Sequence, residues 1–217
     1  MSEPAIKLVA FDMEGCLTAD PTVWEIMHRK LGSWESHGLP YWQRYCAGGL
    51  DYDEFARMDV AAWGRAPVSM LEEAAAEVPL MNGCAELLSA LHAAGIRTAV
   101  ISNGLACVAE RLSRSFGVAH VYANRVVKDG ERLSGRIEIL VPYGGKGQVL
   151  TGLERRLGVR PEEVAAVGDS VSDIAMFRAA RLGIAFRPSA ARVAEAATHI
   201  VADGGLTALL PLLLSGG

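Results

Sequence analysis

From residue 81 onward, helical and extended patterns alternate along the chain, and this rhythm restricts the fold more than any other feature. Strands that alternate with helices predict an α/β fold, with a parallel sheet covered on both faces. A first apolar run at 6–11 adds a strand at the start. Apolar runs predict strands at 97–102, 120–123, 164–169, 183–186 and 200–201, and a hairpin at 126–139. Helical periodicity predicts helices at 84–94, 107–116, 147–157, 174–180 and 190–197.

Residues 19–80 differ from the rest because their pattern is helical with little strand character. Asp20, Asp51 and Ser69 are the predicted N-caps of three helices in this stretch. All the tryptophans of the chain fall here, and we expect them to form the core of a small helical unit: Trp24, Trp34, Trp42 and Trp63. The predicted domains are therefore an α/β core, residues 1–18 and 81–217, and a helical cap inserted after the first strand, residues 19–80.

Composition narrows the classes of partner. The 217 residues are 51% hydrophobic and carry a net charge of −4 with no basic block, so we expect no nucleic-acid partner. Apolar runs at both ends are too short to span a bilayer, and no membrane partner is expected. The cysteines are dispersed without a Cys-x-x-Cys pair, which predicts a reducing, cytoplasmic location. The sequence leaves monomer and homodimer equally open.

Three of the predicted strands end in residues whose side chains can react or bind a ligand: Asp12, Ser102 and Asp169. In a parallel sheet these ends share one edge, where α/β proteins bind their ligands. Glu14 can face the same crevice, and Lys146 follows two glycines at a predicted helix start. Carboxylates, a hydroxyl, an ammonium and helix N–H groups are the parts that phosphoryl transfer requires.

Four segments around these residues match a known set of motifs. They are Phe11-Asp12-Met13-Glu14-Gly15, Ile101-Ser102-Asn103-Gly104, Lys146-Gly147 and Gly168-Asp169-Ser170-Val171-Ser172-Asp173. In order and spacing they resemble the motifs of haloacid dehalogenase (HAD) superfamily phosphatases of subfamily IB, and most of all the phosphoserine phosphatase branch. The resemblance implies a three-layer, Rossmann-like parallel sheet with an inserted helical cap of the C1 type.

The resemblance implies a role for each acid. Asp12 would attack phosphorus and form an aspartyl-phosphate, and Glu14 would protonate the leaving oxygen and then activate water. Asp12, Asp169 and the backbone carbonyl of Glu14 would bind Mg²⁺, with Asp173 supporting the site. A carboxylate attacks a phosphate dianion only when cations screen the repulsion, which agrees with a Mg²⁺ cofactor.

The same resemblance assigns the phosphate and the substrate contacts. Ser102 and the N–H of Asn103 would hold phosphate oxygens, and Lys146 would offset their charge. Arg57 falls at the family's carboxylate-binding position in the cap, whereas Pro21 stands at the position of the family's ammonium-binding glutamate. Phosphoserine is therefore one candidate substrate, and another small phosphorylated acid is nearly as good a candidate.

Three residues depart from the family pattern. Glu14 replaces the usual aspartate and is one methylene longer, Cys16 replaces a common threonine, and Ser172 replaces a frequent asparagine. They leave the rate and the leaving-group preference open.

The sequence therefore predicts a Mg²⁺-dependent phosphomonoester hydrolase acting on a small phosphorylated metabolite. The alternatives are a phosphotransferase that passes the phosphoryl group to an alcohol such as homoserine, or a catalytically weak phosphometabolite-binding protein. A receiver-like signalling domain, which also phosphorylates an aspartate, is a poorer match because such a module has no cap.

Overall fold

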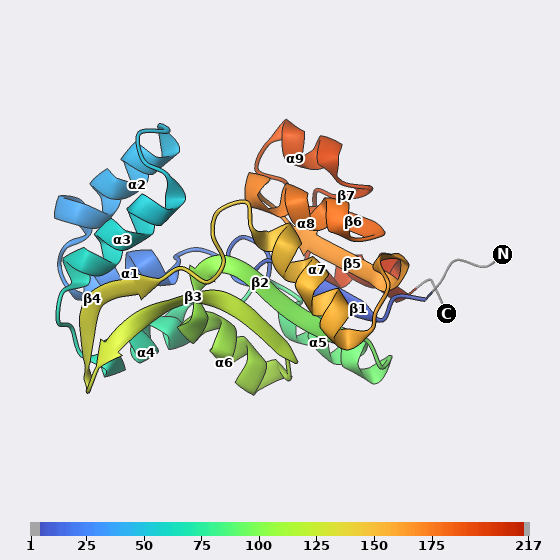
Figure 1. Cartoon of the computed structure of the whole chain (residues 1–217), viewed down its shortest axis with the longest axis horizontal. Coiled ribbons are helices and arrows are strands. Elements are labelled where there is room, and N and C mark those ends of the chain that lie inside the picture. Colours follow the sequence, from blue (N-terminus) through green and yellow to red (C-terminus); the bar gives the residue numbers. More distant parts are fainter. Residues whose placement is uncertain (1–4, 215–217) are drawn as a thin grey trace.

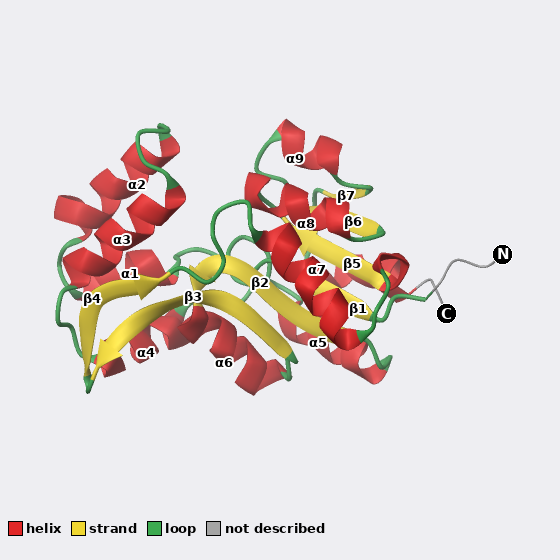
Figure 2. Cartoon of the chain, in the orientation of Figure 1, coloured by secondary structure: helices red, strands yellow, loops and turns green. Residues whose placement is uncertain are grey.

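The computed structural model describes residues 5–214, and this part of the chain forms a seven-stranded sheet with helices on both faces (Figures 1 and 2). The strand order is β4-β3-β2-β1-β5-β6-β7, and every neighbouring pair is parallel except β3 and β4. The strands are β1 (Leu8–Phe11), β2 (Arg97–Leu105), β3 (His120–Asp129), β4 (Arg132–Glu138), β5 (Val164–Gly168), β6 (Leu182–Phe186) and β7 (His199–Val201).

The central strand, β1, is buried on both faces. Val9 and Phe11 belong to one apolar cluster, which includes side chains of α5 and α6. Leu8 and Ala10 belong to a second cluster, with side chains of α7 and α8. Successive side chains of a strand point to opposite faces, so the sheet forms the middle of three layers. The helices around it are α5 (Cys84–Ala93), α6 (Ala106–Phe116), α7 (Lys146–Leu157), α8 (Ile174–Ala179), α9 (Ala191–Ala196) and α10 (Leu210–Leu214). The predicted fold class is confirmed.

Helices also fill the stretch between β1 and α5, as predicted. They are α1 (Val23–Lys30), a π-helical turn (Trp34–Gly38), α2 (Leu39–Cys46), α3 (Tyr52–Trp63) and α4 (Val68–Glu77). Trp24 and Trp63 are buried against each other, with ring centroids 5.5 Å apart, whereas Trp42 is 47% exposed. The tryptophans are thus only partly a core. The division into a core (1–18 and 81–217) and a cap (19–80) stays a prediction.

One of the three predicted helix N-caps is observed in the structure. Asp51 caps α3, because its Oδ1 accepts a hydrogen bond from the N–H of Glu54 at 2.7 Å. The predictions for Asp20 and Ser69 were wrong. Helix α1 starts late enough that Thr22 caps it. Helix α4 already starts at Val68, whose N–H donates to a carbonyl of the β3–β4 hairpin, so Ser69 lies inside the first turn.

Strand β3 is longer than predicted. The predicted strand at 120–123 and the first arm of the hairpin are one continuous strand, which pairs with β2 at its start and with β4 at its end. The hairpin reaches the helical segment, where the N–H of Leu133 donates to the carbonyl of Ala66 at 2.9 Å. This long-range contact left no local signal in the sequence.

Within residues 5–214, no helix is long and apolar enough to cross a membrane.

Candidate active site

The register of the sheet gathers the predicted site residues. Phe11 at the end of β1 pairs with Val100 of β2 and with Val167 of β5. The next residue, Asp12, therefore lies at the same edge as Ser102 and Asp169, which stand two residues beyond those partners. The side chains of all three strand ends accordingly meet at the carboxyl edge of the sheet, where the sequence placed them.

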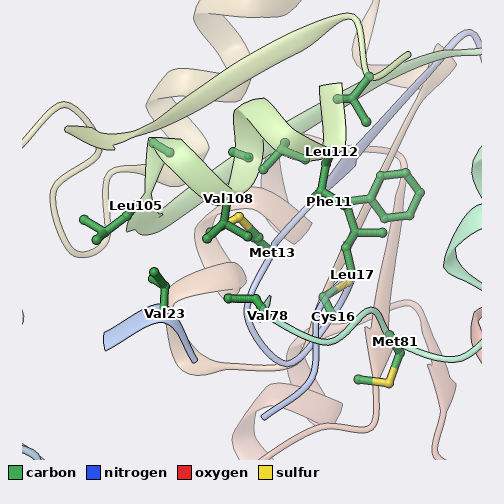
Figure 3. Close-up of a cluster of buried hydrophobic side chains, with 14 of the residues drawn as sticks. Phe11, Met13, Cys16, Leu17, Val23, Val78, Met81, Leu105, Val108 and Leu112 are labelled. Atoms are coloured by element: carbon green, nitrogen blue, oxygen red, sulfur yellow. The ribbon is translucent and has the colours of Figure 1, made fainter. Parts of the chain in front are cut away.

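The loop after β1 is held by its apolar side chains and by a tight turn. The N–H of Gly15 donates to the carbonyl of Thr18, and the N–H of Thr18 donates to the carbonyl of Met13. Figure 3 shows the apolar side chains of this loop among those of α1 and α6. The fully buried members from the loop are Met13, Cys16 and Leu17, with Val23, Val108 and Leu112 around them. This packing fixes Asp12 and Glu14 on a rigid support.

Lys146 is buried between two carboxylates, those of Asp12 and Asp173. Its Nζ is 2.7 Å from Oδ2 of Asp12 and 2.6 Å from Oδ1 of Asp173, and the side chain is 1% exposed. Burial by itself lowers the pKa of an ammonium, but the carboxylates of Asp12 and Asp173 outweigh that effect and raise the pKa of Lys146. Lys146 is therefore a permanent positive charge next to Asp12.

Asp12 and Glu14 differ in their pKa. Burial, together with the charge of Asp173, raises the pKa of Asp12 to about 6, while Lys146 lowers it. Burial and the charge of Asp12 raise the pKa of Glu14 to about 8, although Lys146 and the indole of Trp24 oppose the shift. Glu14 therefore holds a proton more readily than Asp12. This order suits a nucleophile beside a proton donor.

Three carboxylates are close enough to share a cation. One oxygen each of Asp12, Asp169 and Asp173 lies within 4.8 Å of the others. Asp173 is already engaged, because Oδ1 meets Lys146 and Oδ2 accepts from the N–H groups of Asp169 and Ser170. Oδ1 of Asp169 is buried without a hydrogen-bond partner. Since a buried polar atom normally has a partner and carboxylate oxygens are common metal ligands, the set fits a metal-ion site. Burial and the charges of Asp12 and Asp173 raise the pKa of Asp169 to about 8.

The end of β2, beyond Ile101, presents donors to the same point. Ser102 is 2% exposed, and its Oγ accepts from the N–H of Gly104 at 3.1 Å, so its O–H proton is left to donate. Asn103 is fixed by its side chain, which donates to the carbonyl of Val141. Its own carbonyl accepts from Nδ2 of Asn124 and from the hydroxyl of Tyr52. The segment is thus held by three other parts of the chain.

The chain matches the family model of haloacid dehalogenase-like hydrolases over residues 9–178. It belongs to this family. Two curated phosphoserine phosphatases are similar to it: one from Methanocaldococcus jannaschii, 30% identical over 83% of this chain and 85% of the relative, and one from Archaeoglobus fulgidus, 29% identical over 93% and 56%. A solved structure titled as a phospho-aspartyl intermediate analogue of phosphoserine phosphatase superposes with a TM-score of 0.84 and 26% identity. The match covers 96% of this chain and 99% of that one. The predicted family is confirmed.

The hydrolase spans little more than half of the Archaeoglobus relative but most of the Methanocaldococcus one. The family and its relatives are named as hydrolases and phosphatases, in agreement with the predicted enzyme class.

A cleft of about 790 Å³ opens above the acids. Asp12, Glu14, Ser102, Asn103 and Lys146 line it. Arg57 does not line this cleft, since its side chain is exposed on α3. The structure therefore brings together every predicted site residue except Arg57.

Sequence reasoning missed a second group in the cleft. Trp42, Tyr45, Tyr52 and Tyr143 line it, as does Arg192 of α9. Asn124 was also missed, although it is fully buried and its Oδ1 accepts from the N–H groups of Leu140 and Val141.

Proposed function

We propose that this hydrolase is a Mg²⁺-dependent phosphomonoesterase of a small phosphorylated metabolite, working through an aspartyl-phosphate at Asp12. One observation carries the proposal: a buried lysine ammonium is 2.7 Å from Asp12 and 2.6 Å from Asp173, at the floor of the cleft. An ordinary structural lysine is solvent-exposed. The phospho-aspartyl analogue named for the solved relative supports the same intermediate here.

Asp12, Asp169 and the backbone carbonyl of Glu14 would hold the metal, with Asp173 fixing the lysine and the neighbouring loop. When bound, Mg²⁺ supplies positive charge that draws phosphate oxygens toward the acids and reduces their repulsion. Ser102 and the N–H of Asn103 would orient the remaining phosphate oxygens.

The first step forms a bond between Oδ of Asp12 and phosphorus while the ester P–O bond breaks. Glu14, protonated at neutral pH, gives its proton to the departing alkoxide. In the second step Glu14 takes a proton from water, whose oxygen attacks phosphorus and releases phosphate. Asp12 is then a carboxylate again, and Glu14 is again protonated.

Acid quenching during turnover, followed by peptide mass spectrometry, tests the intermediate. We expect one phosphoryl group on the peptide that contains Asp12, dependent on Mg²⁺ and absent from Asp12→Asn, which should be folded but inactive. Asp203→Asn, at an exposed position, is the control and should keep the adduct. Full activity of Asp12→Asn would refute the proposal.

Homoserine distinguishes hydrolysis from transfer to an alcohol. The hydrolase should release inorganic phosphate at the same rate with and without added homoserine, whereas a phosphotransferase would convert homoserine to a phosphate ester.

The small phosphorylated substrate and the dispersed free cysteines support a cytoplasmic enzyme.

A further inference from the structure

One part of the lining of the cleft is aromatic. Trp42 and Tyr45 come from α2, Tyr52 from the start of α3, and Tyr143 from the loop that leads into α7. Their rings form a continuous row, with centroid distances of 5.7 Å (Trp42–Tyr45), 6.0 Å (Tyr45–Tyr52) and 6.2 Å (Tyr52–Tyr143). Two segments about ninety residues apart in the sequence therefore build one surface.

The two ends of this aromatic row face solvent. Trp42 is 47% exposed and Tyr143 is 48% exposed. Large apolar side chains left open inside a cleft offer contact area to a ligand, and flat rings bind other flat rings well. Tyr52 is fixed in place because its hydroxyl donates to the carbonyl of Asn103, next to Ser102. The row thus passes the phosphate end of the cleft at Tyr52 and reaches solvent at both of its ends.

Charged groups on the cap side of the cleft are few. Among the described lining residues, the cap contributes one carboxylate, Asp51, and no lysine or arginine. Asp51 is already used as the N-cap of α3. A zwitterionic alcohol such as serine needs a partner for its ammonium and another for its carboxylate, and this wall supplies no cation for the carboxylate.

The opposite lip carries a free cation. Arg192 on α9 lines the cleft, its side chain is exposed, and it has no ion-pair partner within residues 5–214. Figure 1 shows α9 across from α2 and α3, and residues of all three helices line the same cleft. Lys146, the other cation of the lining, is bound to Asp12 and Asp173.

We propose that the alcohol of the substrate carries a planar aromatic or heteroaromatic ring, which lies along the Trp42–Tyr143 row, with Arg192 meeting a polar or anionic substituent. The proposal rests on the phosphomonoesterase function above. It defines the substrate class by its ring and not by an ammonium and a carboxylate.

A matched pair of esters tests it on the full-length enzyme with Mg²⁺. Benzyl phosphate and cyclohexylmethyl phosphate are similar in size and both release primary alcohols, so they differ mainly in the flat π system. We expect kcat/KM to favour benzyl phosphate by about tenfold. We also expect it to exceed the value for phosphoserine.

Trp42→Leu and Tyr143→Leu remove the exposed rings at positions where folding is not at risk. Each should reduce the preference for the benzyl ester severalfold. Tyr41→Leu is the control, because Tyr41 lies on the same helix and is not a lining residue. It should keep the preference. Equal kcat/KM for the two esters, a higher value for phosphoserine, or a preference that survives both substitutions would overturn the proposal.

Calorimetry with benzylphosphonate and cyclohexylmethylphosphonate, which cannot be hydrolysed, separates the two proposals. Tighter binding of the benzyl compound without turnover of any ester would support the ring site and refute the phosphatase function. Turnover with equal binding of the two phosphonates would support the phosphatase function and refute the ring site.

Discussion

Replacing Lys146 by methionine tests whether the site depends on one buried charge. Lys146 is 1% exposed, and its Nζ lies 2.7 Å from Asp12 and 2.6 Å from Asp173. Methionine keeps most of the volume of the side chain and removes the ammonium. The substitution therefore leaves Asp12 and Asp173 buried without their cation, next to Asp169.

The expected cost follows from that burial. Removing one partner of a buried ion pair costs about 3–5 kcal/mol, because the remaining charge is left desolvated. A volume-conserving exchange adds less than about 1.5 kcal/mol from packing. For a chain of this size, 1 kcal/mol corresponds to about 2–4 °C in Tm, so a total cost of about 3–6.5 kcal/mol should lower the melting temperature by about 6–26 °C.

Thermal unfolding followed by circular dichroism, in buffer with EDTA, measures this change. Lys7→Met is the matched control, since Nζ of Lys7 is also 2.7 Å from a carboxylate, that of Glu163, but its side chain is 58% exposed. A solvent-exposed ammonium is screened by water, so the control should melt close to the wild type. If Lys146→Met also melted within about 2 °C of the wild type, the electrostatic account of the site would be wrong.

Two further predictions concern the catalytic loop and the acid range. Gly15 has φ +79°, and a Cβ there would lie 2.7 Å from Oδ2 of Asp169. Gly15→Ala should thus lose both stability, by at least about 1 kcal/mol, and phosphatase activity. Gly32→Ala, with φ +65° and no atom within 4 Å of the new Cβ, should lose stability alone, and equal activity in the two variants would contradict this reasoning. Hydrogen bonds from Arg160, and then from a lysine, lower the pKa of Glu163 from 4.5 to about 2. Because the folded pKa is the lower one, the ionised carboxylate stabilises the fold above about pH 4.5, and this contribution is lost as the pH falls toward 2. The difference in Tm between wild type and Glu163→Gln should therefore disappear at low pH, and a difference that grew on acidification would contradict the sign.

Most of the sheet could be predicted because its signals are local. Leu8 to Phe11 form a continuous apolar run that needs no partner to be recognised as a strand, and the acid after it marks the strand end. Errors arose where another segment decided the boundary. Helix α4 starts two residues early because Val68 bonds to the hairpin, and β3 is extended by its pairing with β4.

The substrate side of the site was less predictable for the same reason. Arg57 has the right position in a sequence comparison, but the turn of α3 directs it to solvent. Tyr52 and Tyr143 give no local signal of a shared surface, since chain distance does not reveal that their rings lie 6.2 Å apart.

The sequence by itself determined the α/β architecture, and it supplied the groups that the proposed mechanism uses, Asp12, Glu14, Lys146 and Asp169, because side-chain type and strand-end position are local properties. Only the tertiary structure decided their protonation and the lining of the cleft. A pKa depends on burial and on charges from distant segments, and a surface depends on which rings the fold brings side by side. Protonation of the acids and the choice of alcohol are therefore properties of the folded chain.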